Sequence, residues 1–162
     1  MSWMIHRIDD RLIHGQVLIA WGERLHPRRI VIADDAAAAD PWERELLGSA
    51  APGVEVEIAT IAAVAAAYDR EATRDGGAFL LVRDLASARR LVENGARVPR
   101  WTIGGLHYAP GKDKVNEYVY LNAGDRRDAR ALLERGVALE LQDVPATSPL
   151  PLADLDASVR SA

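Results

Sequence analysis

The side chains best suited to chemistry lie near the N-terminus, where Asp10, Arg11 and His14 follow a short apolar run. A neutral imidazole carries a free lone pair on one ring nitrogen and can act as a nucleophile near neutral pH. A guanidinium is planar and binds phosphate oxygens in pairs, while a carboxylate can fix the tautomer of a neighbouring imidazole. We therefore expect His14 and Arg11 to handle a phosphoryl group, with Asp10 supporting the imidazole ring.

A helix is expected to begin directly after this histidine, with Gly15, Gln16 and Val17 in its first turn. The N–H groups at a helix start are unpaired, and the helix dipole is positive there, so these three amides could bind phosphate oxygens. Gly15 has no side chain to obstruct that approach. The alternative is that His14 is an ordinary residue near a capped, solvated helix terminus, and spacing alone does not decide between the two.

The pattern of apolar residues predicts the elements that would position this loop. Short apolar runs rich in β-branched residues alternate with segments of helical periodicity. The predicted strands are residues 3–8, 29–33, 54–59, 78–82, 100–103, 117–121 and 137–144. This alternation predicts an α/β fold: a doubly wound, mostly parallel open sheet of about seven strands, with helices on both faces and one antiparallel edge strand. Because residues 103–115 lack a helical pattern, the strand at 117–121 is expected to be that antiparallel edge.

Length and composition indicate one domain over residues 1–144, with residues 145–162 as a C-terminal extension packed on it or trailing from it. The net charge of −4 argues against a nucleic-acid-binding protein. Neither an apolar run long enough to span a bilayer nor a signal peptide is evident, so a cytoplasmic protein is expected. The chain has no cysteine, and nothing in the pattern calls for a metal or another cofactor.

Further polar residues follow other predicted strands, at the sheet edge where open α/β proteins bind ligands. Asp34 and Asp35 come after the second strand, and residues 104–112 come after the fifth. We expect Asp35 to support the phosphate-binding loop, although a turn and a helix cap would also explain both aspartates. His107 is expected to be a surface or partner-contact residue, and His6 a core or edge residue with a satisfied ring.

Residues 7–17, Arg-Ile-Asp-Asp-Arg-Leu-Ile-His-Gly-Gln-Val, resemble the active-site signature of the mannose/fructose/sorbose family of phosphotransferase-system (PTS) enzyme IIB components. The resemblance covers roughly residues 5–144 and includes Trp21 and the Gly104-Gly105 pair. It implies that His14 is phosphorylated on Nδ1 by a phosphohistidine IIA domain. The phosphoryl group would then pass to a sugar held by membrane IIC and IID components, which makes the chain a protein-phosphohistidine–sugar phosphotransferase. Arg11 matches the arginine of the same loop.

Two functions stay open at this point. The first is a sugar phosphocarrier, cytoplasmic and peripherally associated with a membrane permease complex, for which a homo-oligomer is compatible with the sequence. The second is a regulatory PTS protein whose His14 phosphorylation state is read by a protein partner without sugar transport. A receiver domain phosphorylated on aspartate is disfavoured, because the third strand ends in Ala59 and Thr60 where that aspartate would be needed. No Gly-x-Gly-x-x-Gly follows the first strand, which argues against a dinucleotide-binding domain.

Overall fold

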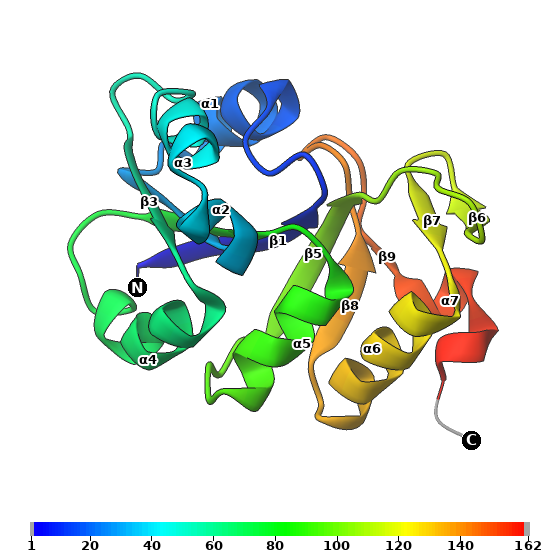
Figure 1. The fold of residues 1–162 in the computed structure, drawn as a ribbon. Coiled ribbons are helices and arrows are strands. Elements are labelled where there is room, and N and C mark those ends of the chain that lie inside the picture. The colour runs from blue at the N-terminus through cyan, green and yellow to red at the C-terminus, as the bar shows by residue number, and fades with distance from the viewer. Residues whose placement is uncertain (1, 161–162) are drawn as a thin grey trace.

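An open seven-stranded sheet forms the centre of the computed structural model, which describes residues 2–160 (Figure 1). The strand order is β3-β2-β4-β1-β5-β8-β9. The strands are β1 (Trp3–Asp9), β2 (Arg29–Ala33), β3 (Glu55–Ala59), β4 (Ala78–Val82), β5 (Arg100–Gly105), β8 (Ala138–Leu141) and β9 (Leu150–Pro151). Neighbouring strands pair in parallel except β8 and β9, which are antiparallel. The predicted doubly wound, mostly parallel sheet with one antiparallel edge strand is confirmed.

The antiparallel edge strand is not the segment that the sequence pattern indicated, and that part of the prediction is wrong. Most of residues 117–121 forms β7 (Val119–Leu121), which pairs antiparallel with β6 (Asp113–Asn116) in a separate two-stranded sheet. The place beside β5 is taken by β8, which arrives in parallel after helix α6 (Ala123–Glu134). A hairpin can form between residues close in the chain, so 113–121 pairs with itself, and β9 becomes the edge.

Helices cover both faces of the sheet (Figure 1). One face carries η1 (Gln16–Trp21), α1 (Gly22–Leu25), α2 (Asp35–Ala39) and α3 (Pro41–Gly48). The other face carries α4 (Ile61–Glu71), α5 (Leu85–Glu93) and α6. Side chains alternate across a strand, so Phe79 and Leu80 of β4, both fully buried, belong to different apolar clusters, one on each face. The central strands are therefore shielded from water on both sides.

The first helix differs from the single amphipathic helix expected after His14. It consists of a π-helix, η1, followed by one α-helical turn, α1. Val17 and Trp21 are buried against the sheet, whereas Leu18 and Leu25 are half-buried. π-Helical turns are rare and occur often at functional sites. Here the wide turn lies directly after the predicted active-site loop.

The C-terminal residues pack against β8 and α6. They form β9, α7 (Leu152–Leu155) and the 3₁₀ turn η2 (Ala157–Val159). Leu152 and Val159 are fully buried in the apolar cluster that α6 also lines. Asp156 accepts a hydrogen bond from Arg126 Nε of α6 at 2.7 Å. These residues share the core of the sheet.

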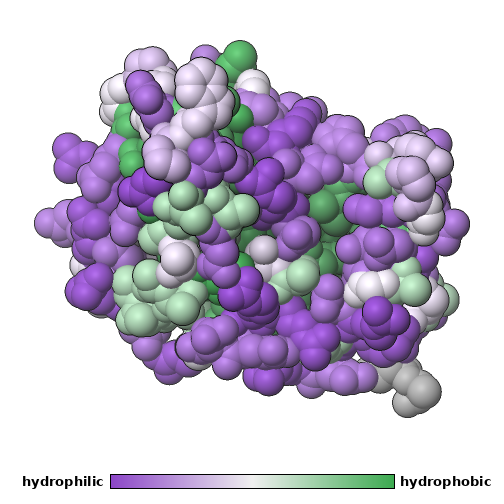
Figure 2. Space-filling view, viewed as in Figure 1, coloured by the Kyte–Doolittle hydropathy of each residue, from purple (hydrophilic) through white to green (hydrophobic). Residues whose placement is uncertain are grey.

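The face of the molecule in Figure 2 is mostly hydrophilic, with separate apolar patches. The largest exposed apolar side chain is Trp42 of α3, at 75% exposure. Among residues 2–160, no helix combines the length and the apolar character that a bilayer crossing requires.

Candidate functional site

The loop that follows β1 carries the residues predicted to do chemistry. β1 ends at Asp9, and the chain turns through residues 10–15 before η1 begins at Gln16. Leu12 in this turn has a φ of 57°, a left-handed conformation that a leucine rarely adopts. Its side chain is buried, and its N–H donates to the Asp9 carbonyl at 3.0 Å. Burial of Leu12 thus maintains a tight turn that brings His14 back over Asp9.

The carboxylate of Asp9 is the centre of the site and is fully buried. Its Oδ2 accepts hydrogen bonds from His14 Nε2 at 2.8 Å, Arg11 Nη2 at 3.2 Å and Arg7 Nη2 at 3.3 Å. Its Oδ1 accepts from Arg11 Nε at 3.2 Å and from the Arg11 backbone N–H at 3.1 Å. Burial raises the pKa of Asp9, but the hydrogen bonds from His14 and Arg11 outweigh it and lower the pKa to about 2. Asp9 is therefore ionised at neutral pH.

The tautomer of His14 follows from this contact. An ionised carboxylate only accepts hydrogen bonds, so the proton of the neutral ring must be on Nε2. Nδ1 then holds the lone pair, and the backbone N–H of Gln16 donates to it at 3.3 Å. The side chain of His14 is 14% exposed. Nδ1 is therefore the ring nitrogen that has a lone pair available, and it lies beside the first amide of η1.

Arg11 lies beside His14 with one edge of its guanidinium on Asp9. Its Nη2 also donates to Gln16 Oε1 at 3.1 Å, and its side chain is 38% exposed. Within residues 2–160, no hydrogen bond is found from Arg11 Nη1. The structure thus brings Arg11, His14 and Gln16 together, as the sequence predicted.

Gly104 and Gly105 at the end of β5 make room for the two guanidinium groups. A Cβ at Gly104 would lie 2.0 Å from Arg7 Cζ, and one at Gly105 would lie 3.1 Å from Arg11 Nη2. A Cβ at Gly104 would displace Arg7, and one at Gly105 would press on Arg11. The glycine pair noted in the sequence therefore has a steric reason, which is the close approach of arginines from the neighbouring strand and loop.

Asp10 does not contact the imidazole of His14, so its expected supporting role is corrected. Its Oδ1 lies 2.6 Å from His107 Nδ1, and its Oδ2 accepts from the His107 backbone N–H at 2.8 Å. Asp9 occupies the position expected of Asp10, because β1 extends one residue further than predicted and side chains alternate along a strand. Because side chains alternate along a strand, Asp9 lies on the same side of β1 as Arg7, and Asp10 does not. This alternation is the sequence signal that could have identified Asp9.

Asp35 lies away from the phosphate-binding loop, and its expected role there is also corrected. Its Oδ1 accepts from the Ile61 N–H at 2.9 Å, and its Oδ2 accepts from Arg90 Nη2 at 2.8 Å. Asp34 caps α2 by accepting from the Ala37 N–H at 2.9 Å. The reason is the strand order, in which β4 separates β2 from β1. Asp34 is thus a helix cap, and Asp35 links the first residue of α4 to Arg90 of α5.

Residues 3–161 match the family model of the PTS system sorbose subfamily IIB component. The chain belongs to this family. It is 32% identical over 155 residues to the PTS system sorbose-specific EIIB component of Klebsiella pneumoniae, an alignment that covers 95% of this chain and 94% of that protein. The crystal structure of the IIBSor domain of the sorbose permease from Klebsiella pneumoniae matches with a TM-score of 0.86 and 32% identity, covering 96% of each chain.

A longer relative is the PTS system mannose-specific EIIAB component of Escherichia coli (strain K12), which is 33% identical over 150 residues. The alignment covers 92% of this IIB chain and 46% of that protein, so the chain spans about half the length of that relative. The resemblance inferred from residues 7–17 is therefore confirmed at the level of the family. The fold of the IIB domains also agrees with the one described above.

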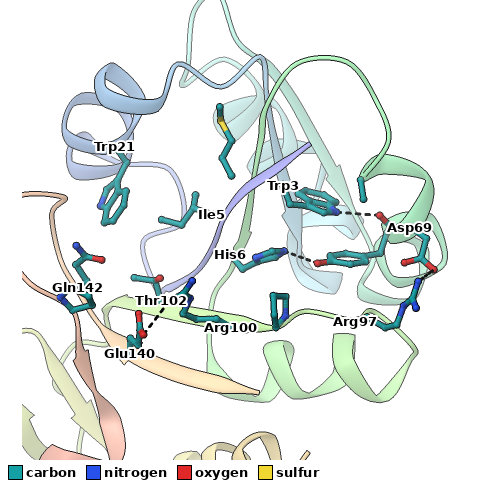
Figure 3. A pocket seen from close by; sticks show the side chains of 15 residues that line it. Trp3, Ile5, His6, Trp21, Asp69, Arg97, Arg100, Thr102, Glu140 and Gln142 are labelled. Atoms are coloured by element: carbon teal, nitrogen blue, oxygen red, sulfur yellow. Dashed lines mark hydrogen bonds and ion pairs between the residues drawn. The ribbon is translucent and has the colours of Figure 1, made fainter. Parts of the chain in front are cut away.

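A groove of about 710 Å³ runs along β1, β5 and β8 of this IIB domain (Figure 3). Trp21 and Gln142 lie at one end, and the Arg97–Asp69 ion pair lies at the other. His6 lines the groove with Nε2 2.8 Å from the Tyr68 hydroxyl. Burial, with a contribution from Arg100, lowers the pKa of His6 to about 4. His6 is thus a neutral, satisfied histidine, as expected.

Proposed function

We propose that this chain is the phosphocarrier of a sugar phosphotransferase system. His14 Nδ1 accepts a phosphoryl group from a phosphohistidine of a IIA domain and passes it to a sugar held by membrane IIC and IID components. The observation that carries the proposal is the hydrogen bond from His14 Nε2 to Asp9, because it leaves the lone pair on Nδ1. Membership of the IIB family supports the same role.

Each transfer breaks one P–N bond: the first step forms a new P–N bond to His14, and the second forms a P–O bond to the sugar. In the first step the His14 Nδ1 lone pair attacks phosphorus in line, and the P–N bond to the donor imidazole breaks. In the second step a sugar hydroxyl oxygen attacks, the P–N bond to Nδ1 breaks, and the hydroxyl proton passes to a base beside the sugar or to water. Nε2 keeps its proton throughout and donates its hydrogen bond to the ionised Asp9. The buried carboxylate therefore offsets the positive charge that the ring acquires when Nδ1 bonds to phosphorus.

The surrounding donors supply charge stabilisation for the phosphoryl oxygens. Gln16 N–H already points at Nδ1, and Arg11 Nη1 lies on the guanidinium edge away from Asp9. Gly15 and Val17 belong to the same turn, where amides at a helix start favour an anion. No metal or other cofactor enters this scheme. The protein contributes positioning and fixed charge, which are the main requirements of phosphoryl transfer.

The regulatory alternative has no supporting observation, since the relatives described above are named for the sugars of their systems. With IIC and IID as partners, the protein would work at the cytoplasmic face of the membrane, in contact with the permease. A homo-oligomer is not required by the scheme.

The test is labelling of the purified chain by a phosphorylated IIA protein of a sorbose- or mannose-type system. The wild type should acquire an acid-labile, alkali-stable label, as expected of phosphohistidine, and His14→Gln should acquire none. Loss of the contact to Asp9 should lower the unfolding free energy by only about 1 kcal/mol, so the variant stays folded. His26→Gln, at an exposed residue outside the loop, is the matched control and should label normally. Labelling of His14→Gln at the wild-type rate would refute the proposal.

A further inference from the structure

Arg7 is a buried arginine that takes no part in the phosphoryl-transfer steps proposed above. Its side chain is 1% exposed, and it lies on β1 two residues before Asp9. Nη1 donates to the Gln142 carbonyl at 3.0 Å, and Nη2 donates to the Asp143 carbonyl at 3.0 Å and to Asp9 Oδ2 at 3.3 Å. Its buried Nε has no hydrogen-bond partner within residues 2–160. Burying a guanidinium, and leaving one N–H unsatisfied, costs free energy that an apolar side chain would not.

The fold is built closely around this guanidinium. The ring of Trp21 lies with its centroid 5.5 Å from Arg7 Cζ, and Trp21 Nε1 donates to the Asp143 carbonyl at 2.8 Å. Gly104 on β5 supplies the space on which the guanidinium depends. Figure 3 shows Trp21 and Gln142 at the same end of the groove. Arg7 is therefore held by β5, by η1 and by the loop after β8, and it cannot turn toward a ligand.

Arg7 and Arg11 differ in exposure although both donate to Asp9 Oδ2. Arg11 is 38% exposed and has a guanidinium edge that faces away from Asp9. If Arg11 shifts toward a phosphoryl group, its contacts with Asp9 weaken at the moment when His14 must keep its proton on Nε2. Arg7 would keep its hydrogen bond to Asp9, because its other hydrogen bonds fix the guanidinium to the backbone carbonyls of Gln142 and Asp143.

We infer that Arg7 is a positioning residue for phosphoryl transfer: it holds the Asp9 carboxylate so that Oδ2 accepts from His14 Nε2 and Nδ1 stays free. The inference rests on the proposed function, and it deepens it by assigning a part to a residue that touches neither phosphate nor sugar. Through Trp21 the same guanidinium contacts the end of η1, whose first amide donates to Nδ1. One buried cation thus contacts both the carboxylate that accepts from Nε2 and the helix whose first amide donates to Nδ1.

The experiment compares the full chain with its Arg7→Gln and Arg7→Lys variants. The ring tautomer of His14 is read from ¹⁵N chemical shifts after histidine-selective labelling, and transfer kinetics are read with a phosphorylated IIA donor. The wild type should be almost entirely Nε2–H. Arg7→Gln should show a mixture of tautomers and a maximal transfer rate lower by about ten-fold, with the KM for the donor unchanged. Arg7→Lys, which restores charge without the planar fork, should recover part of both.

Arg29 provides the matched control. Arg29 is the first residue of β2, away from Asp9, and is 2% exposed. Its guanidinium donates hydrogen bonds to Glu71 and Ser2. Arg29→Gln should lose stability but keep the wild-type tautomer and rate in its folded fraction. If Arg7→Gln does not fold, Arg7→Lys carries the test, since lysine is closer to arginine in volume; it should show a smaller tautomer mixture and a smaller loss of rate than Arg7→Gln would.

The outcomes separate the inference from the function on which it rests. Wild-type tautomer and rate in the folded Arg7 variants would overturn the inference and leave the phosphocarrier role intact. A wild-type chain that is not labelled on His14 would overturn the phosphocarrier role. An Arg29→Gln protein with the same tautomer mixture as Arg7→Gln would show a general loss of packing and would also overturn the inference.

Discussion

Replacement of Asp9 by asparagine is the most informative single change in this chain. Asparagine keeps the size of the side chain but removes the charge that receives hydrogen bonds from Arg7, Arg11 and His14. When the amide oxygen accepts from Arg11 Nε and the Arg11 backbone N–H, the N–H₂ faces His14 Nε2 and donates to it, which moves the ring proton to Nδ1. The nucleophilic lone pair is then lost from the position where phosphoryl transfer needs it. Transfer should fall by about 10³-fold or more, as wrong-tautomer substitutions do in serine proteases.

The lowered pKa of Asp9 sets how much stability the Asp9→Asn variant loses. The pKa is lowered from its ordinary value of 3.8 to about 2 in the folded protein. At about 1.4 kcal/mol per pH unit, the folded state favours ionised Asp9 by about 2 kcal/mol relative to the unfolded chain. Because the folded pKa is the lower one, this stabilisation is present above pH 4 and disappears as the pH falls toward 2. Asp9→Asn lacks it at every pH.

The assay is urea unfolding of both proteins between pH 2 and pH 7. At pH 7 the variant should be less stable by about 3 kcal/mol, since breaking a buried ion pair leaves two guanidinium groups without their carboxylate. The difference should shrink by about 2 kcal/mol between pH 4 and pH 2, where the wild type also protonates Asp9. Other carboxylates titrate in both proteins and cancel. A stability difference that stays constant across this range would refute the assignment of Asp9 as the ionised centre of the site.

Three further changes test separate parts of the structure. Arg11→Lys keeps the charge but loses the planar fork, so phosphoryl transfer measured by quenched flow should slow by about ten-fold or more, and an unchanged rate would exclude Arg11 as the phosphate clamp. Gly104→Ala places a Cβ 2.0 Å from Arg7 Cζ and should lower the unfolding free energy by about 1–3 kcal/mol in urea titrations. Gly48→Ala, with no atom within 4 Å of the added Cβ, should change stability by less than about 0.5 kcal/mol, and equal effects would contradict the steric argument. His6 has a pKa of about 4 instead of 6.5, so the unfolded chain binds its proton first, and about 3 kcal/mol of stability should be lost as the pH falls from 6.5 to 4. That loss should be absent from a His6→Phe protein followed by the same unfolding assay.

Much of the fold could be predicted from the sequence because its signals are local. The apolar run at 78–82 forms β4, buried throughout, and the periodicity of Ile61, Val64, Ala65 and Tyr68 forms the buried stripe of α4. The loop signature of residues 7–17 identified His14 and Arg11, and the structure places both at the carboxyl end of β1. Strand and helix periodicity depend on residues a few positions apart, which is why a single sequence contains them.

The partners of His14 were decided only by the tertiary structure. Sequence spacing could not distinguish Asp9 from Asp10, because the choice depends on where β1 ends and on which side of the strand faces η1. Asp35 was predicted to support the loop, but in the strand order β4 lies between β2 and β1 and separates Asp35 from it. The environment of Arg7 depends on carbonyls 135 and 136 residues away, and that of Asp10 depends on His107, 97 residues away. By itself the sequence determined the chemistry of the loop and the alternation of strands and helices. Only the packed sheet decided which carboxylate accepts the hydrogen bond from the imidazole, because strand order and register bring together groups that no local pattern connects.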